Sequence, residues 1–206
     1  KYVEAIDSFR KDVDILPTDA QFQSNLGVAF YQSGNIDSAL ARYQKAIRLL
    51  PSYSHAYINL GHLYLDVEKI DLAETAARKA LNLEQSSSAL SLLGRVFEKQ
   101  NNFDEAENYY KQAVDQSPHT TQYLVNLAGF YYDRGQLDEA IQAYNNSISI
   151  MPKDADLFYN LGNCYARKCQ LDLAQEYYEN AIDINPRLIG ALNNHGLILV
   201  QKKKHE

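Results

Sequence analysis

The sequence predicts an all-α protein built as an array of similar helix pairs, and two observations lead to this prediction. A short stretch, Asn160-Leu161-Gly162, returns in related form along the whole chain. Its glycine, or the residue in that place, recurs at intervals of 34, 33, 34, 34 and 34 residues, at Gly27, Gly61, Gly94, Ala128, Gly162 and Gly196. Self-similarity at a fixed period of this length indicates a repeat array, in which each unit buries its apolar face against its neighbours.

Placing this glycine eighth in each repeat defines the predicted boundaries. Five complete repeats cover residues 20–53, 54–86, 87–120, 121–154 and 155–188, and the second of them is one residue short. Residues 1–19 match the second helix of a truncated repeat. Residues 189–206 match the first helix of another truncated repeat, or a cap.

The first half of each repeat carries the pattern of an amphipathic helix. In one repeat Tyr57, Leu60, Gly61 and Tyr64 fall at positions i, i+3, i+4 and i+7, which lie on one helical face. The glycine or alanine on that face removes side-chain bulk, so we expect a second helix to approach closely there.

The second half of each repeat predicts another helix. An aspartate at a constant place is expected to be its N-cap, and Glu74, Glu107 and Gln175 would complete capping boxes three residues later. Four of the five helices end before a proline, which cannot continue a helix. The recurring residues are the aspartates Asp37, Asp71, Asp104, Asp138 and Asp172, the aromatics Tyr43, Tyr110, Tyr144 and Tyr178, and the prolines Pro51, Pro118, Pro152 and Pro186.

The turn inside each repeat is predicted to contain one residue in the left-handed conformation. Gly34 and Gly135 occupy that slot in two repeats, and glycine adopts this conformation without steric cost. Glu68, Asn101 and Cys169 occupy it in the other three, where we expect strain at Glu68 and Cys169.

Composition narrows the class of partner. The net charge of −6 is spread along the chain, which disfavours nucleic acid or an anionic membrane as the ligand. No apolar run reaches transmembrane length, and no signal peptide is visible.

The two cysteines, Cys164 and Cys169, are poorly spaced for a disulfide, so we expect free thiols and an intracellular, cytoplasmic protein. Because the chain begins at Lys1 without methionine, we expect it to be a piece of a longer protein.

The complete pattern resembles the tetratricopeptide repeat (TPR) family. The matching residues are Leu26, Gly27 and Phe30 on the first helix, Ala39, Tyr43 and Ala46 on the second, Pro51, and their equivalents in later repeats. The resemblance implies a right-handed superhelical solenoid of antiparallel helix pairs, whose concave groove is lined by the first helices. It also implies a protein or peptide partner and no chemistry by the fold itself.

One groove position carries asparagine in five of six repeats: Asn25, Asn59, Asn126, Asn160 and Asn194, with Leu92 in the remaining one. A carboxamide both donates and accepts hydrogen bonds, which suits the backbone of an extended peptide. In this respect the array resembles the TPR arm of O-linked N-acetylglucosamine transferases. The alternative interpretation is that each asparagine only bonds a neighbouring repeat or is inherited framework, and the sequence leaves both open.

Four further residues are candidates for peptide contact: Tyr31, Tyr132, Tyr159 and Asn163. Tyrosine supplies rigid contact area at interfaces. The carboxylate clamp of chaperone-binding members needs Lys and Arg beside asparagine. Asn163 and Asn194 are suitably spaced, but Tyr159 and Gly190 stand at the basic positions, so a chaperone clamp is not expected.

We predict no catalysis, cofactor or metal site in this chain. Phosphate-binding loops, nucleophile elbows and paired catalytic carboxylates are absent from the sequence. His55 and His62 lie two helical turns apart and lack a third ligand. The predicted function is therefore a protein-interaction scaffold that binds an extended peptide or partner helix. Two alternatives are the substrate-recruiting arm of a larger enzyme, such as a glycosyltransferase, and self-association through the repeat ends.

Overall fold

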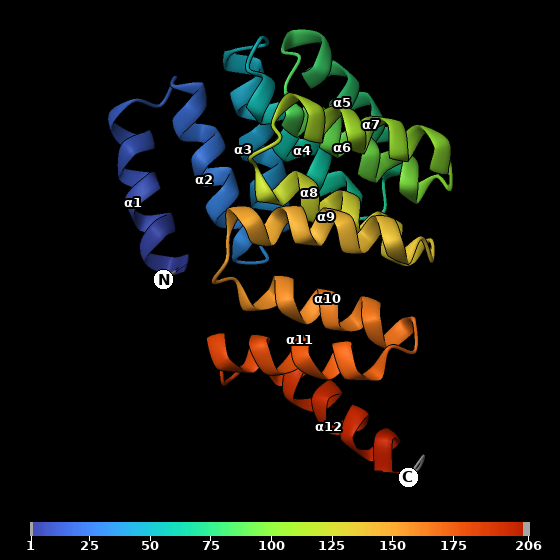
Figure 1. The fold of residues 1–206 in the computed structure, drawn as a ribbon. Coiled ribbons are helices and arrows are strands. Elements are labelled where there is room, and N and C mark those ends of the chain that lie inside the picture. The colour runs from blue at the N-terminus through green and yellow to red at the C-terminus, as the bar shows by residue number, and fades with distance from the viewer. Residues whose placement is uncertain (1, 204–206) are drawn as a thin grey trace. The chain divides into compact units, whose positions relative to one another are not determined.

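The computed structural model describes residues 2–203, and within that range every element is an α-helix (Figure 1). The chain divides into two compact units, residues 1–116 and 117–206. The first unit contains α1 (Tyr2–Ile15), α2 (Ala20–Gln32), α3 (Ile36–Leu49), α4 (Ser54–Asp66), α5 (Ile70–Leu83), α6 (Ser87–Lys99) and α7 (Phe103–Gln116). The second contains α8 (Thr121–Asp133), α9 (Leu137–Ile150), α10 (Ala155–Arg167), α11 (Leu171–Ile184) and α12 (Ile189–Lys203). The fold is an all-α helical repeat array.

Each repeat is a pair of helices joined by three residues. Helix α2 packs on α3, α4 on α5 and α6 on α7 in the first unit, and α8 on α9 and α10 on α11 in the second. The first helices also contact one another along the array, α2 with α4, α4 with α6 and α10 with α12. We call the surface that they form, in each unit, the first-helix face. All second helices end two residues before their proline, or before Gln85 in the repeat without one.

The turn residues adopt the predicted conformation. Gly34 and Gly135 have φ values of 81° and 78°, and Glu68, Asn101 and Cys169 have values of 57°, 60° and 58°. A side chain in this region carries a steric cost that glycine avoids. The backbone geometry of the repeat is therefore kept even where the sequence lacks glycine.

The prediction that the recurring aspartates are N-caps is wrong. Helix α3 begins at Ile36, and its cap is Asn35, whose Oδ1 accepts a hydrogen bond from the Ser38 backbone N–H at 3.2 Å. Asp37 lies inside the first turn, where its charge interacts favourably with the positive end of the helix dipole. The helices begin two residues earlier than expected because the apolar residue before each aspartate packs towards the core, as Ile36 does. The prediction of capping boxes in α5 and α11 is wrong for the same reason. Lys69 and Gln170 occupy the cap positions of these helices and make no side-chain cap hydrogen bond.

A buried tyrosine from the second helix fills the space above the glycine of the first helix. A Cβ atom added to Gly27 would lie 2.7 Å from the Tyr43 ring, and one added to Gly162 would lie 2.5 Å from the Tyr178 ring. Tyr43 and Tyr178 are each 1% exposed. The glycine is therefore required by contact with the tyrosine ring, as the sequence predicted for a close approach of the second helix.

In the repeat from 54 to 86, a different side chain fills the space above the glycine of the first helix. The second helix of this repeat carries Ala77 where the other repeats carry tyrosine. The space above Gly61 is filled instead by Leu92 from the next repeat, whose Cδ2 would lie 2.6 Å from an added Cβ. Both Ala77 and Leu92 are fully buried. Leu92 therefore replaces asparagine because it must supply the volume that Ala77 does not.

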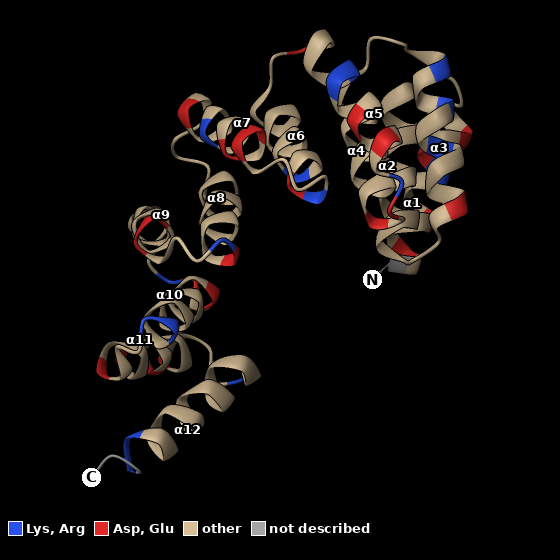
Figure 2. Ribbon diagram, turned by 90° about the vertical axis from the view of Figure 1, so that its right-hand side faces the viewer, with Lys and Arg blue, Asp and Glu red and all other residues tan. Residues whose placement is uncertain are grey.

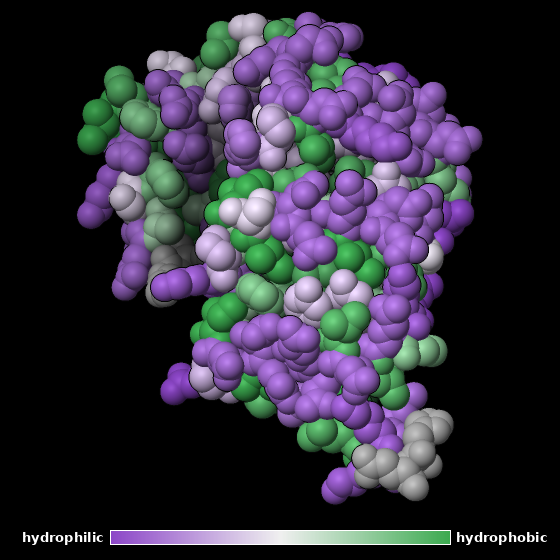
Figure 3. All heavy atoms as spheres, viewed as in Figure 1, coloured by the Kyte–Doolittle hydropathy of each residue, from purple (hydrophilic) through white to green (hydrophobic). Residues whose placement is uncertain are grey.

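The surface is mixed in charge and polarity. Lysine and arginine are scattered over the helices of both units (Figure 2). Polar side chains cover much of the face of the second unit shown in Figure 3, with apolar side chains between them. Several apolar residues of α12 are exposed, among them Leu197 at 67% and Val200 at 55%. None of the described helices is long and apolar enough to cross a membrane.

Replacing Leu92 with asparagine should destabilise the first unit by roughly 3 kcal/mol, because it removes buried apolar volume and buries an amide. Adding Ala77→Tyr should restore most of that stability, since it recreates the pair found in the other repeats. Urea unfolding followed by circular dichroism measures both effects. The control is Leu72→Asn, at a residue that is 46% exposed on α5. A double variant that is less stable than Leu92→Asn alone would contradict this packing model.

Candidate functional site

The five asparagines of the repeated position are all half-buried, and their hydrogen bonds differ. Asn59 donates to the Ser24 hydroxyl of the preceding repeat at 3.2 Å, and Asn194 donates to Asn163 Oδ1 of the preceding repeat at 2.8 Å. Asn126 accepts from Gln122 Nε2 on its own helix at 2.9 Å. Asn25 and Asn160 make no side-chain hydrogen bond within the described part of the chain. At Asn59 and Asn194 the amide therefore links adjacent repeats.

In four of its five occurrences, asparagine at this position follows a second helix that carries the buried tyrosine, whereas Asn25 follows Phe9 on α1. The pairs are Tyr43 with Asn59, Tyr110 with Asn126, Tyr144 with Asn160, and Tyr178 with Asn194, whereas Ala77 is followed by Leu92. In the last pair the asparagine Nδ2 lies 3.5 Å from the tyrosine hydroxyl. An amide beside a buried phenol satisfies a polar group that would otherwise lie in an apolar setting. The pattern thus has a packing component.

A polar network crosses the first-helix face of the first unit. The Tyr31 hydroxyl on α2 donates to Asp66 Oδ2 on α4. Arg95 on α6 lies 3.8 Å from the same carboxylate, and its Nη1 donates to His62 Nδ1 at 2.7 Å. The network therefore joins three consecutive repeats, and its arginine already has a carboxylate and an imidazole as partners.

The network shifts two pKa values. Burial lowers the pKa of His62 to about 4, and the nearby Arg95 charge adds to the shift. Burial and the hydrogen bond to Asp66 raise the pKa of Tyr31 to about 12. At neutral pH the imidazole is therefore uncharged, which is required for its Nδ1 to accept a hydrogen bond from arginine.

In the second unit, a cavity of about 330 Å³ opens on the first-helix face. It gathers three of the residues predicted as site residues, Tyr132 on α8, Asn163 on α10 and Asn194 on α12. Asn163 Oδ1 accepts hydrogen bonds from Asn194 and, at 2.9 Å, from the Tyr178 hydroxyl. The remaining lining residues are Ala166, Arg167, Tyr178, Leu197 and Ile198. The cavity thus combines an amide pair, a cation and an apolar wall, a combination suited to a peptide side chain.

Arg167 is held at the edge of this cavity by Tyr132. Its guanidinium lies 5.1 Å from the centre of the tyrosine ring, and its Nη1 donates to the Tyr132 backbone carbonyl. These contacts fix the orientation of a side chain that is otherwise exposed.

The other predicted residues lie elsewhere. Tyr159 packs against Gly190, whose added Cβ would lie 3.0 Å from the tyrosine ring, and this contact occupies the positions where a chaperone clamp would need basic residues. Asn160 lines a separate cavity of about 640 Å³ near the start of α8 and α10. The structure therefore groups Tyr132, Asn163 and Asn194, and leaves Tyr31, Tyr159 and Asn160 outside that group.

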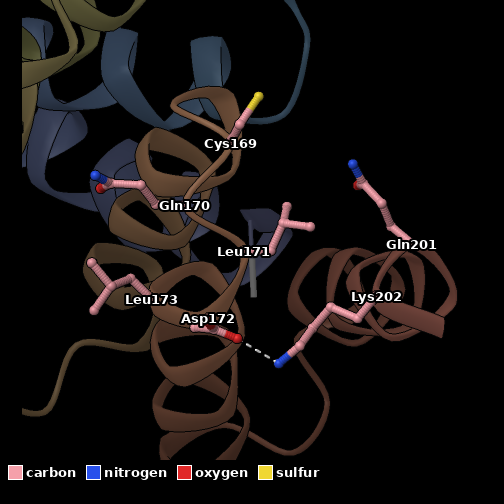
Figure 4. A pocket seen from close by; sticks show the side chains of 7 residues that line it. All are labelled: Cys169, Gln170, Leu171, Asp172, Leu173, Gln201 and Lys202. Carbon is pink, nitrogen blue, oxygen red and sulfur yellow. Dashed lines mark ion pairs between the residues drawn. The ribbon is translucent and has the colours of Figure 1, made fainter. Parts of the chain in front are cut away.

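A third cavity, of about 810 Å³, lies between the start of α11 and the end of α12 (Figure 4). It is lined by Leu171, Leu173 and the ion pair between Asp172 and Lys202, at 2.7 Å. None of the predicted site residues lines it. Lys202 lies in helix α12, which continues to Lys203.

Sequence reasoning missed the role of Asp66. It stands in the same slot as Arg167. Each of the two lies 35 residues after the tyrosine that contacts it, one more than the repeat period of 34, and this spacing was the signal available. His55 is exposed and His62 half-buried. In the described part of the chain, no group of three or more His, Cys, Asp or Glu side chains is placed to hold a metal ion.

The lowered pKa of His62 predicts pH-dependent stability of the first unit. Between the unfolded value of 6.5 and the folded value of about 4, the unfolded state binds more protons, so stability should fall as the pH drops through this window. The loss should be on the order of 2 kcal/mol. Urea unfolding at pH 7 and pH 4.5 should show this loss for the wild type and a smaller one for His62→Gln. The control is His55→Gln, on the same helix, and equal pH dependence in both variants would contradict the assignment.

Models of one repeat family match most of the chain. Those described as TPR repeat match residues 29–67 and 130–168, and those described as tetratricopeptide repeat match residues 54–118, 98–146 and 155–188. No curated protein sequence matches the chain.

Solved structures show the same fold. A chain of the APC/C hetero-tetramer Cut9–Hcn1 is 24% identical with a TM-score of 0.82, and the match covers 97% of this chain and 40% of that one. YrrB, described as a TPR protein with an unusual peptide-binding site, is 29% identical with a TM-score of 0.62, covering 92% of this chain and 98% of that one. MamA is 23% identical with a TM-score of 0.63, covering 82% and 92%. The chain belongs to the tetratricopeptide repeat family.

Proposed function

We propose that this chain is a protein-interaction scaffold that binds an extended peptide, or a partner helix, on its first-helix face. The observation that carries the proposal is the cavity in the second unit, where Tyr132, Asn163 and Asn194 from three different helices converge. Such a surface is formed before the ligand arrives, so little ordering cost falls on the receptor. The similarity to YrrB, which is described as having a peptide-binding site, also supports peptide binding.

The proposal has two parts that can be tested separately: binding at the cavity, and binding along the repeated asparagines. Asn163 and Asn194 line the cavity, and their amide groups bond to each other. Asn126 and Asn160 would contribute only if the repeated asparagines hold the peptide backbone along the array. The proposal concerns binding alone and assigns no reaction to this chain.

Peptides selected from a displayed random library should bind the wild-type chain and lose about tenfold in affinity for Asn163→Ala with Asn194→Ala, because two amide groups are removed. Asn126→Ala with Asn160→Ala should also weaken binding if the repeated asparagines contact the backbone. Fluorescence anisotropy with the labelled peptide measures both, and circular dichroism melting checks folding.

The matched control is Asn145→Ala with Asn146→Ala, at two exposed positions on α9. Equal affinity of the cavity variant and this control would contradict the proposed site. A loss confined to the cavity variant would restrict binding to the cavity and remove the role of the repeated asparagines elsewhere.

Self-association is a second candidate, supported by helix α12. Leu192 and Leu199 on this helix are 44% and 40% exposed, and a Cβ added to Gly196 would meet no atom within 4 Å. In the complete repeats the equivalent face packs against the second helix of the pair. This apolar face could therefore contact a second copy of the chain.

If α12 mediates self-association, the sedimentation coefficient of the wild-type chain should rise with concentration, and Leu192→Glu with Leu199→Glu should abolish the rise, since charges on that face disfavour apolar burial. Leu173→Glu, at an exposed leucine of α11, is the control. A wild-type chain that sediments as a monomer at all concentrations would exclude this candidate.

A further inference from the structure

In the first unit, the two charged groups beside the first-helix tyrosine Tyr31 are paired with each other. Tyr31 contacts Asp66 of the next repeat, and Arg95 of the repeat after that supplies the opposite charge. Anion and cation lie on consecutive first helices, so this part of the face needs no external ion.

The second unit repeats the arrangement with different chemistry. Tyr132 stands in the slot of Tyr31, and the residue that it contacts one repeat later is Arg167. The slot that holds Arg95 in the first unit holds Leu197 in the second. An arginine has thus replaced the carboxylate, and a leucine has replaced the counter-charge.

Arg167 consequently makes no ion pair among the residues that the structure describes. Its contacts with Tyr132 use one N–H group and one face of the guanidinium, whereas the side chain carries five N–H donors in a rigid plane. The group is held in place, lines the cavity and keeps most of its donors available.

Asn163 supplies a second donor to the same cavity. It lies one helical turn before Arg167 on α10, so the two side chains are neighbours. Its Oδ1 already accepts from Tyr178 and Asn194, and its Nδ2 has no partner in the described range. An amide N–H and a guanidinium side by side form a donor pair for a carboxylate.

We propose that the cavity of the second unit binds the acidic side chain, Asp or Glu, of an extended peptide. The carboxylate pairs with Arg167 and Asn163, and a neighbouring apolar residue of the peptide packs on Leu197 and Ile198. Leu197 is 67% exposed, so it offers apolar area that a peptide residue would cover. This inference rests on the proposed peptide-binding function and specifies its ligand by charge.

The test uses a library of random peptides displayed without a free carboxyl terminus, selected against the whole chain. Selected peptides should share an acidic residue next to an apolar one. They are then synthesised with acetylated and amidated ends, once with the acidic residue and once with glutamine in its place. On the wild-type chain the change to glutamine should weaken binding about tenfold, the effect of losing one charge-assisted hydrogen-bonded pair.

The Arg167→Gln variant should bind both peptides with similar affinity, because the partner of the carboxylate is gone. Arg167→Lys keeps the charge but loses the planar fork, so it should retain part of the preference for the acidic peptide. This variant also keeps the test valid if Arg167→Gln fails to fold. Arg187→Gln, at an exposed arginine of the second unit, should behave as the wild type.

Two outcomes would overturn the inference. One is a set of selected peptides without any acidic preference, which would leave peptide binding intact. The other is an equal loss of affinity, in the wild type and in Arg167→Gln, when the acidic residue of the peptide is changed to glutamine. That result would place the carboxylate elsewhere. Failure to select any peptide would instead contradict the proposed function itself, and this inference with it.

Discussion

Three of the repeats are organised by the contact between a buried tyrosine of the second helix and a glycine of the first, at Gly27, Gly94 and Gly162. The ring occupies the volume that a Cβ atom would need. At Gly162, for example, an added Cβ atom would lie 2.5 Å from the Tyr178 ring. Close packing of this kind leaves little tolerance for a change in volume. The exchange of tyrosine for Ala77, with Leu92 entering from the next repeat, shows that the volume is conserved even where the residues are not.

The same tyrosines connect the core to the first-helix face. Their rings are buried, but the hydroxyl of Tyr178 reaches Asn163, and that of Tyr110 reaches Glu98 at 2.6 Å. Burial raises the pKa of Tyr178 to about 12, so this hydroxyl stays protonated and can donate. In these two repeats a core tyrosine thus orients a polar side chain on the face, and core packing and surface chemistry are coupled.

The two units show how one scaffold carries different charges in equivalent places. Tyr31 is paired with a carboxylate and Tyr132 with a guanidinium, although both lie at the same point of the repeat. In the first unit the carboxylate is balanced by Arg95, whereas the second has an apolar residue at the equivalent place. Because the helices supply the geometry and the face residues supply the charge, the binding preferences of repeats can differ without a change in fold.

The sequence by itself determined the period, the number of helix pairs and the left-handed turn residues, because these depend on local spacing and on backbone sterics. Helix starts were misplaced by about two residues, since Asp37 and its equivalents are good caps in isolation but the apolar residue before each is drawn into the core. Only the tertiary structure decided which groups meet across repeats. The partners of Asn194 and Arg167 lie 31 and 35 residues away. Such contacts depend on how neighbouring helices pack, and a single-residue pattern does not encode that packing.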